Sequence, residues 1–141
     1  MPDYIWDLYM KRILFFLMVI TAVFISGCKD KGTGFIGTWN EVTKEQYPST
    51  VVVNYDDGVY HVDVKYLDKK LEDKKRAQAF EDYMLGKTKE RPSNLMDLSD
   101  CYSVRTLEAK ALNDTTLQGD GFTMRIENGN LKYNGKTFVK K

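Results

Sequence analysis

Two neighbouring segments in the middle of the chain, residues 50–56 and 59–66, carry many hydrophobic residues, and in the second segment these alternate with polar residues. Both segments are rich in β-branched and aromatic residues, and Asp57-Gly58 between them suits the left-handed backbone of a tight turn. In the second segment every other residue is apolar: Tyr60, Val62, Val64 and Tyr66. Because successive side chains of a strand point to opposite faces, the pattern predicts a β-hairpin with one face in a core.

The C-terminal part of the chain repeats this arrangement. Apolar and polar residues alternate over 122–127, and the turn dipeptides Asn128-Gly129 and Asn134-Gly135 lead into short segments at 131–133 and 137–139. These segments predict three more strands joined by tight turns.

The segment before this C-terminal part is less regular. Residues 101–112 and 115–118 predict two further strands, although residues 107–110 would suit a helix equally. The turn between the two strands is expected at Asn113-Asp114.

One stretch has helical rather than strand spacing. Residues 68–85 consist of good helix formers, with Asp68 placed to cap the first turn and Gly86 placed to end the last one. We therefore predict a mainly β fold, an antiparallel meander or a small barrel, with one inserted α-helix. Closure into a barrel would remove the exposed edges of an open sheet.

Three residues at the start of the first candidate strand, Gly37-Thr38-Trp39, resemble the Gly-x-Trp motif that opens lipocalin-like barrels. The resemblance implies a small lipocalin-like barrel whose bottom is closed by the indole of Trp39. Lipocalins carry their helix after the last strand, whereas the helix predicted here lies in mid-chain. We expect a ligand site, if the barrel has one, to be lined by aromatic residues: Trp39, Tyr55, Tyr60 and Tyr66.

The N-terminal region has the layout of a secretory signal. Lys11-Arg12 precedes an uncharged stretch, residues 13–25, which spans about 20 Å as a helix against about 30 Å of bilayer hydrocarbon. The stretch ends in Ile25-Ser26-Gly27-Cys28, which resembles the lipobox of bacterial lipoproteins. The resemblance implies cleavage between Gly27 and Cys28, followed by lipidation of the Cys28 sulfur with diacylglycerol and acylation of the new amino terminus.

These features divide the chain into a signal peptide (1–27), a lipidated cysteine with a short tether (28–34) and a small β domain (35–141). Because acidic residues precede Lys11-Arg12, we expect translation to start at Met10. The resemblance places the mature protein on a bacterial cell membrane, facing the periplasm. The residue after Cys28 is Lys29 and not the aspartate that retains lipoproteins in the inner membrane of enteric bacteria, which favours the outer membrane.

Charge and composition exclude several classes of function. The 21 basic and 20 acidic residues leave a net charge of +1, which gives no field for gathering nucleic acid. The single histidine, His61, lies near Asp63 but has no further ligands in sequence, so we expect no metal, no cofactor and no enzymatic activity. Asp97 and Asp100 are typical of turns.

The second cysteine, Cys101, would have no partner within the chain once Cys28 is lipidated, so it is expected to be buried or to pair with another chain. Basic residues also crowd the first half of the predicted helix: Lys69, Lys70, Lys74, Lys75 and Arg76. They suit a solvated face, or an approach to lipid head groups or to an acidic partner.

Two functions fit these observations. The first is a non-catalytic, lipid-anchored binding module for an envelope or secreted protein partner, and the alternative is a lipocalin-like carrier of a small hydrophobic ligand. A pocket lined by Trp39 and the tyrosines would favour the carrier, whereas a filled core with an exposed aromatic or basic patch would favour the protein binder.

Overall fold

A computed structural model describes residues 3–24 and 30–141 of the chain, in two separate compact units. The first unit holds the helix α1 (Asp3–Phe24), and the second unit begins at Lys31 and holds all the strands. The predicted cleavage and lipidation positions, Gly27 and Cys28, lie outside the described residues. Among the residues that are described, no helix has both the length and the apolar character needed to cross a bilayer.

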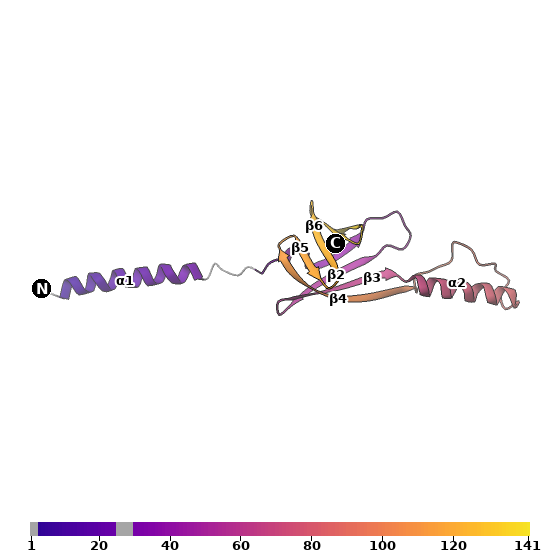
Figure 1. Ribbon diagram of the computed structural model, residues 1–141, viewed down its shortest axis with the longest axis horizontal. Coiled ribbons are helices and arrows are strands. Elements are labelled where there is room, and N and C mark those ends of the chain that lie inside the picture. Colours follow the sequence, from indigo (N-terminus) through magenta and orange to yellow (C-terminus); the bar gives the residue numbers. More distant parts are fainter. Residues whose placement is uncertain (1–2, 25–29) are drawn as a thin grey trace. The chain divides into compact units, whose positions relative to one another are not determined.

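The second unit is a closed antiparallel barrel in which each strand pairs with the next along the chain and the last pairs with the first (Figure 1). The strands are β1 (Gly37–Glu41), β2 (Thr50–Asp56), β3 (Val59–Leu67), β4 (Tyr102–Asn113), β5 (Thr116–Gly119), β6 (Phe122–Glu127), β7 (Asn130–Tyr133) and β8 (Lys136–Lys140). A single helix, α2 (Lys69–Met84), is inserted between β3 and β4. The predicted mainly β barrel with one inserted helix is thereby confirmed.

Turn chemistry sets the strand boundaries. Asp57, Asn128 and Asn134 have positive φ angles of 47°, 52° and 51°, and a glycine with positive φ follows each of them. The helical alternative for residues 107–110 is wrong, because these residues lie in β4, where Leu107 pairs with Val62 and packs against the core. Pairing with β3 outweighs the weak local helix preference of this segment.

The end of the barrel at which β1 begins is sealed, and we call it the closed end. The buried Trp39, 2% exposed, donates a hydrogen bond of 2.8 Å from its indole Nε1 to the Phe35 carbonyl oxygen. The Tyr60 hydroxyl donates to the carbonyl oxygen of Lys31. Gly32 has a φ of 84°, and a Cβ atom there would lie 3.0 Å from the Ala111 Cβ, so both the backbone conformation and the close approach to the barrel wall favour glycine.

The folded unit therefore starts earlier than the sequence predicts. The tether was expected to extend to Gly34 because it offers almost nothing apolar to bury, yet the compact unit begins at Lys31. Backbone groups and a short 3-10 turn, η1 (Thr33–Phe35), do the sealing, and backbone contacts leave little trace in a hydrophobic pattern.

The interior of the barrel is filled by side chains from every strand. The core cluster comprises Phe35, Trp39, Val51, Val53, Tyr60, Val62, Val64, Ala109, Leu117, Met124, Leu131 and Phe138. All of these residues belong to the unit that starts at Lys31. We therefore treat residues 30–141 as a domain that folds by itself.

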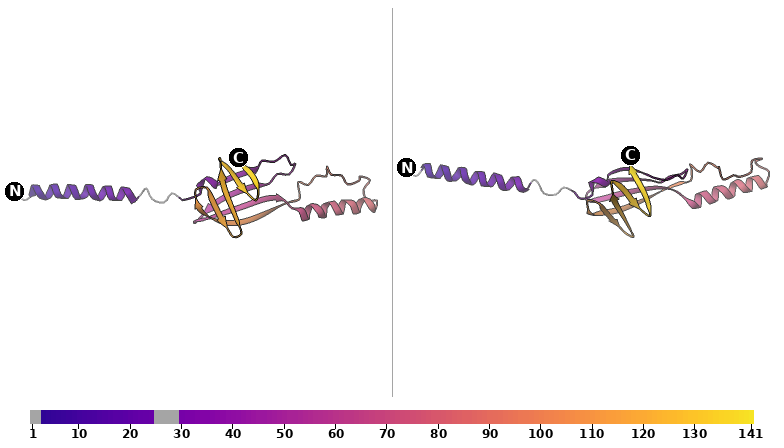
Figure 2. Two further views of the ribbon diagram at one scale, coloured as in Figure 1. Left: turned by 45° about the horizontal axis from the view of Figure 1, so that its top comes forward. Right: turned by 90° about the horizontal axis from the view of Figure 1, so that it is seen from above.

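The inserted helix and the loop after it, residues 69–101, form a projection that we call the arm (Figure 2). Asp68 caps α2 as predicted, with its carboxylate accepting hydrogen bonds from the Lys70 backbone N–H at 2.9 Å and from the Ser103 hydroxyl at 2.7 Å. These two bonds, the Ser103 bond first, lower the pKa of Asp68. The helix buries none of its residues, so the arm extends from the β3–β4 hairpin rather than packing on the barrel.

The seal at the closed end gives a stability prediction. Replacing Trp39 with Phe removes the N–H donor to the Phe35 carbonyl and leaves a gap in the core, which should lower the free energy of unfolding of residues 30–141 by about 3 kcal/mol. Urea unfolding followed by circular dichroism measures this. The half-exposed Val139 serves as a control, because Val139→Ala should cost only about 0.5 kcal/mol. Equal losses in both variants would show that the seal is not a principal source of stability.

Candidate binding site

The opposite end of the barrel is open because two neighbouring strands differ in length. Strand β4 has 12 residues and β5 has 4, and the pairs between them begin only at Ala109 and Gly119. Residues 102–108 of β4 thus pair with β3 on one side and have no strand partner on the side of β5. The β3–β4 hairpin consequently extends beyond the rim and forms one tall wall of the open end (Figure 1).

A pocket of about 440 Å³ lies at this open end. Its apolar surfaces come from the core side chains Val64 and Phe138 and from the rings of Tyr47, Tyr66 and Tyr133. The remaining lining residues are mostly polar or charged: Glu45, Gln46, Ser49, Leu67, Lys69, Glu72, Arg105, Asn134 and Lys136. The pocket thus combines an apolar floor with a polar rim, which is the usual composition of small-molecule sites.

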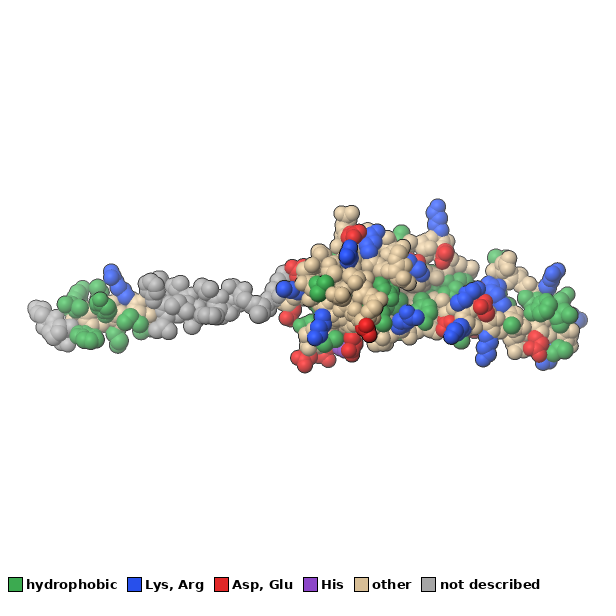
Figure 3. Space-filling view, in the orientation of Figure 1, with side chains coloured by type: hydrophobic (Ala, Val, Ile, Leu, Met, Phe, Trp, Pro, Cys, Tyr) green, Lys and Arg blue, Asp and Glu red, His purple; other side chains and the backbone are tan. Residues whose placement is uncertain are grey.

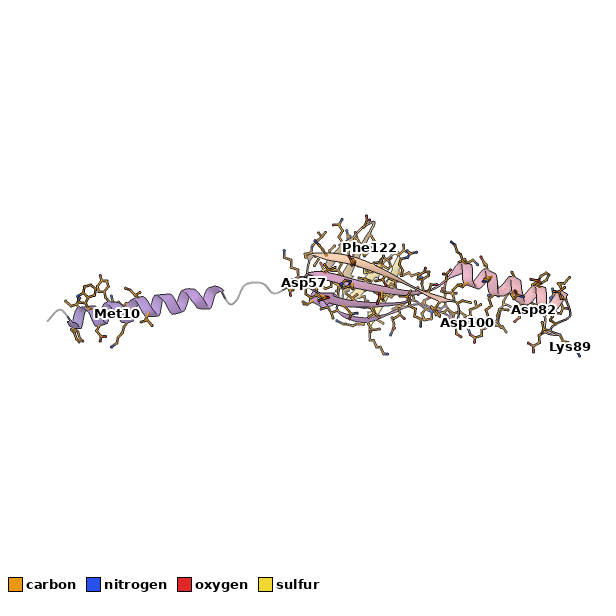
Figure 4. The ribbon with its side chains drawn as sticks, turned by 90° about the horizontal axis from the view of Figure 1, so that it is seen from below. Met10, Asp57, Asp82, Lys89, Asp100 and Phe122 are labelled. Carbon is orange, nitrogen blue, oxygen red and sulfur yellow. The ribbon has the colours of Figure 1, made fainter. Side chains whose placement is uncertain are left out.

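A second hollow of about 380 Å³ adjoins the first where β4 lacks its partner. Arg105, Tyr133 and Asn134 line both hollows. Phe122, labelled in Figure 4, lines the second hollow and meets the Tyr133 ring edge-on, with ring centroids 6.1 Å apart. Because residues 102–108 of β4 do not pair with β5, the open end extends past the first pocket along the free side of β4.

Most charged groups at the pocket are neutralised by neighbours in the fold. The Glu41 side chain, 7% exposed, accepts a hydrogen bond of 2.7 Å from the Ser49 backbone N–H and lies 3.4 Å from the Lys136 ammonium. Lys69 pairs with Asp73 at 3.1 Å, and its pKa is raised by that contact. Such pairs fix the rim without adding net charge to it.

Arg105 differs from these groups. Its guanidinium lies 5.5 Å from the centre of the Tyr66 ring, and among the described residues no carboxylate forms an ion pair with it. The register places Arg105 directly opposite the buried Val64, so its side chain starts from the inner face of the barrel.

The residues predicted to bind a ligand are divided between the two ends of the barrel. Tyr66 lines the open-end pocket. Trp39 and Tyr60 are instead packed in the core at the closed end, and Tyr55 lies against Tyr60 with ring centroids 4.7 Å apart. Alternation along a strand identifies inward-facing residues, but it does not show which end of a barrel is filled.

The histidine lies outside the pocket. His61 Nδ1 is 3.9 Å from Glu108 Oε1, and Asp63 accepts a hydrogen bond of 2.8 Å from the Thr106 hydroxyl. In the described part of the chain, no three metal-binding side chains come together. These residues therefore make pairwise contacts across the outer face of β3 and β4.

Cys101 is buried, which is the first of the two predicted alternatives, and it is a free thiol. Burial, followed by its contact with Asp100, raises the pKa of this thiol, so little of it is thiolate at neutral pH. Asp97 and Asp100 belong to the loop of the arm, where Lys75 donates to the Asp97 carbonyl and to Asp100 Oδ1, both at 2.6 Å.

The basic cluster on α2 thus has a structural use that the sequence did not suggest. Lys75 fastens the loop to the helix, and Arg76 pairs with Glu72 at 3.2 Å. The loop is tied to the barrel as well, because the Leu98 backbone N–H donates a hydrogen bond of 2.8 Å to the Tyr47 hydroxyl. Tyr47 is a pocket residue that sequence analysis missed, since it lies in the irregular loop between β1 and β2.

Comparison with known proteins adds no relative: no family model, no curated protein and no solved structure matches this chain.

Proposed function

We propose that this protein is a non-catalytic binding protein that holds a small amphipathic molecule at the open end of its barrel. The observation that carries the proposal is the pocket of about 440 Å³, with tyrosine and phenylalanine walls and a polar rim, at the unsealed end. Small-molecule sites have about 300–1,000 Å³ and favour the mouths of barrels. The barrel interior is packed, so the ligand lies at the rim and not deep inside.

We further propose that a lipid on Cys28 attaches the mature protein to the bacterial cell membrane, with the barrel facing the periplasm. The support is the sequence: a basic start, a short apolar stretch, and small residues before Cys28. One acyl chain binds a bilayer only marginally, whereas two or three chains hold a protein durably. The lysine after Cys28 favours the outer membrane.

The proposed site predicts which residues should change their nuclear magnetic resonance signals when a ligand binds. Titrating residues 30–141 with an organic extract of the producing bacterium should shift the nuclear magnetic resonance signals of Tyr47, Tyr66 and Tyr133, and leave the Trp39 indole signal in place. Tyr66→Ala should weaken the binding about tenfold, because it removes a wall of the pocket. Tyr83→Ala, which removes a ring from the arm, is the matched control and should have no effect. Shifts at Trp39 without shifts at the rim would contradict the proposal.

The proposed lipid anchor predicts the mass of the N-terminal peptide of the mature protein. The N-terminal peptide from the membrane fraction should begin at Cys28 and carry a diacylglycerol, with or without a third acyl chain. Cys28→Ala should remove the lipid, prevent cleavage after Gly27 and leave the folding of the barrel unchanged, since the barrel core begins at Phe35. An unmodified peptide that starts upstream of Cys28 in the wild-type protein would contradict the anchor.

A second candidate function, the binding of a protein partner, is favoured by the arm. Large apolar side chains lie exposed along α2 and its loop: Phe80 at 58%, Met84 at 66%, Leu85 at 61% and Leu95 at 88%. Figure 3 shows hydrophobic side chains gathered toward the far end of the arm, with basic ones around them. Asp82 and Lys89, labelled in Figure 4, lie in this part of the arm, whereas Asp100 lies at its base. Exposed apolar patches with polar surroundings are typical of protein contact sites.

This candidate predicts position-dependent crosslinking. A photoreactive amino acid at Phe80 should give one discrete crosslinked product with an envelope protein in living cells. The same group at Gln78, which is exposed two residues earlier on α2, should give much less product. The same yield at both positions would indicate random encounters and would count against the arm as a docking site.

A further inference from the structure

The charges around the open-end pocket differ in how they are compensated. Glu41 and Lys136 neutralise each other, as do Lys69 and Asp73. Arg105 lines both hollows of the open end, and in the part of the chain that the structure describes it forms no ion pair. A guanidinium stays charged at every physiological pH, so the open end carries a permanent positive group.

The register of β4 explains why this charge faces the pocket. Arg105 is directly opposite Val64, and the interior positions that follow along β4 are Leu107 and Ala109, opposite Val62 and Tyr60. Arg105 is therefore a charged residue at an inward-facing position of β4, whereas the next two inward-facing residues, Leu107 and Ala109, are apolar. Because β5 is absent beside residues 102–108, the arginine is left at the rim without a covering strand.

The face of the Tyr66 ring lies beneath this guanidinium at 5.5 Å from its carbon. The aromatic face holds the guanidinium in position, while the N–H groups at the edge of the guanidinium plane stay free to donate hydrogen bonds. Tyr133 and Phe138 supply further apolar surface in the same pocket. Beside a fixed cation, these rings offer room for the apolar body of a ligand.

Three carboxylates line the two hollows and oppose an incoming anion, and one of them, Glu72, is already paired with Arg76 at 3.2 Å. Glu45 lines the first hollow and Asp120 lines the second, and both are exposed without an ion pair to Arg105. Arg105 is exposed as well, so water screens all of these charges, but its side chain starts from the inner face of the barrel and it lines both hollows. Arg105 is therefore the group that attracts an anion at this site, and Glu45 and Asp120 reduce that attraction.

On the basis of the function proposed above, we infer that the open-end pocket selects an organic anion. Its carboxylate, sulfonate or phosphate head group accepts hydrogen bonds from the Arg105 guanidinium, and its aromatic or aliphatic body packs against Tyr66, Tyr133 and Phe138. Arginine suits such head groups because its planar fork matches two oxygen atoms at once. A neutral molecule with the same body would fill the pocket but leave the cation unpaired.

Two fluorescent dyes with one aromatic body test this selection. Anilinonaphthalenesulfonate carries a sulfonate and N-phenylnaphthylamine carries none, and both brighten when they leave water. Each dye is titrated into residues 30–141, after circular dichroism has shown cooperative unfolding of every variant. The sulfonate dye should bind about tenfold more tightly than the neutral dye.

Variants assign the preference to Arg105. Arg105→Gln should weaken binding of the sulfonate dye about tenfold and leave the neutral dye unchanged, while Arg105→Lys should restore part of the loss. Arg125→Gln is the matched control, because Arg125 follows the buried Met124 on β6 and lies on the outer face of the barrel. Glu45→Gln should tighten binding of the sulfonate dye only.

The outcomes separate this inference from the function on which it rests. If both dyes bind equally, lose affinity in Tyr66→Ala and ignore Arg105→Gln, anion selection is wrong while the open-end site stands. If neither dye binds and the bacterial extract shifts no signal at the rim, both are wrong. If Arg125→Gln weakens the sulfonate dye as much as Arg105→Gln does, the attraction is general surface charge and anion selection by Arg105 is overturned.

Discussion

The closure of one sheet upon itself is the constraint on which the rest of this structure depends. Strand β1 pairs with β8 through only three residue pairs, from Trp39 and Lys140 to Glu41 and Phe138. These pairs convert a meander with two free edges into a barrel, and they place Trp39 where its indole meets the Phe35 carbonyl. Trp39 and its neighbours fill the barrel at the closed end. The pocket lies at the opposite end, where β4 extends beyond β5.

The amino-acid sequence predicts the strands well because the fold repeats one local feature, a tight turn between two short strands. Asp57-Gly58, Asn128-Gly129 and Asn134-Gly135 define tight turns by residue type alone, and the alternation on either side fixes which face is buried. The helix after Asp68 is equally local, since its cap, its composition and Gly86 all act within a few residues. Local rules left strand and helix equally open at residues 107–110, where pairing with β3 decides for the strand.

The open-end pocket was less predictable, because it arises from pairings between strands that are distant in the sequence. Tyr66 could be identified as inward-facing from its alternation, but Trp39 and Tyr60 have the same pattern and lie in the packed core. What separates them is the end of the barrel that each faces, which depends on strand length and register. Arg105 gave no signal in the sequence, because a charged residue in an irregular strand is normally assigned to the outside.

Tyr47 belongs to the pocket and to the attachment of the arm at the same time. Its ring lines the open end, and its hydroxyl receives the Leu98 N–H of the arm loop at 2.8 Å. Two binding events that share one side chain are thermodynamically linked, and the influence of each on the other is equal in size. A change in the position of the arm loop therefore changes the lining of the pocket, because both depend on the Tyr47 side chain.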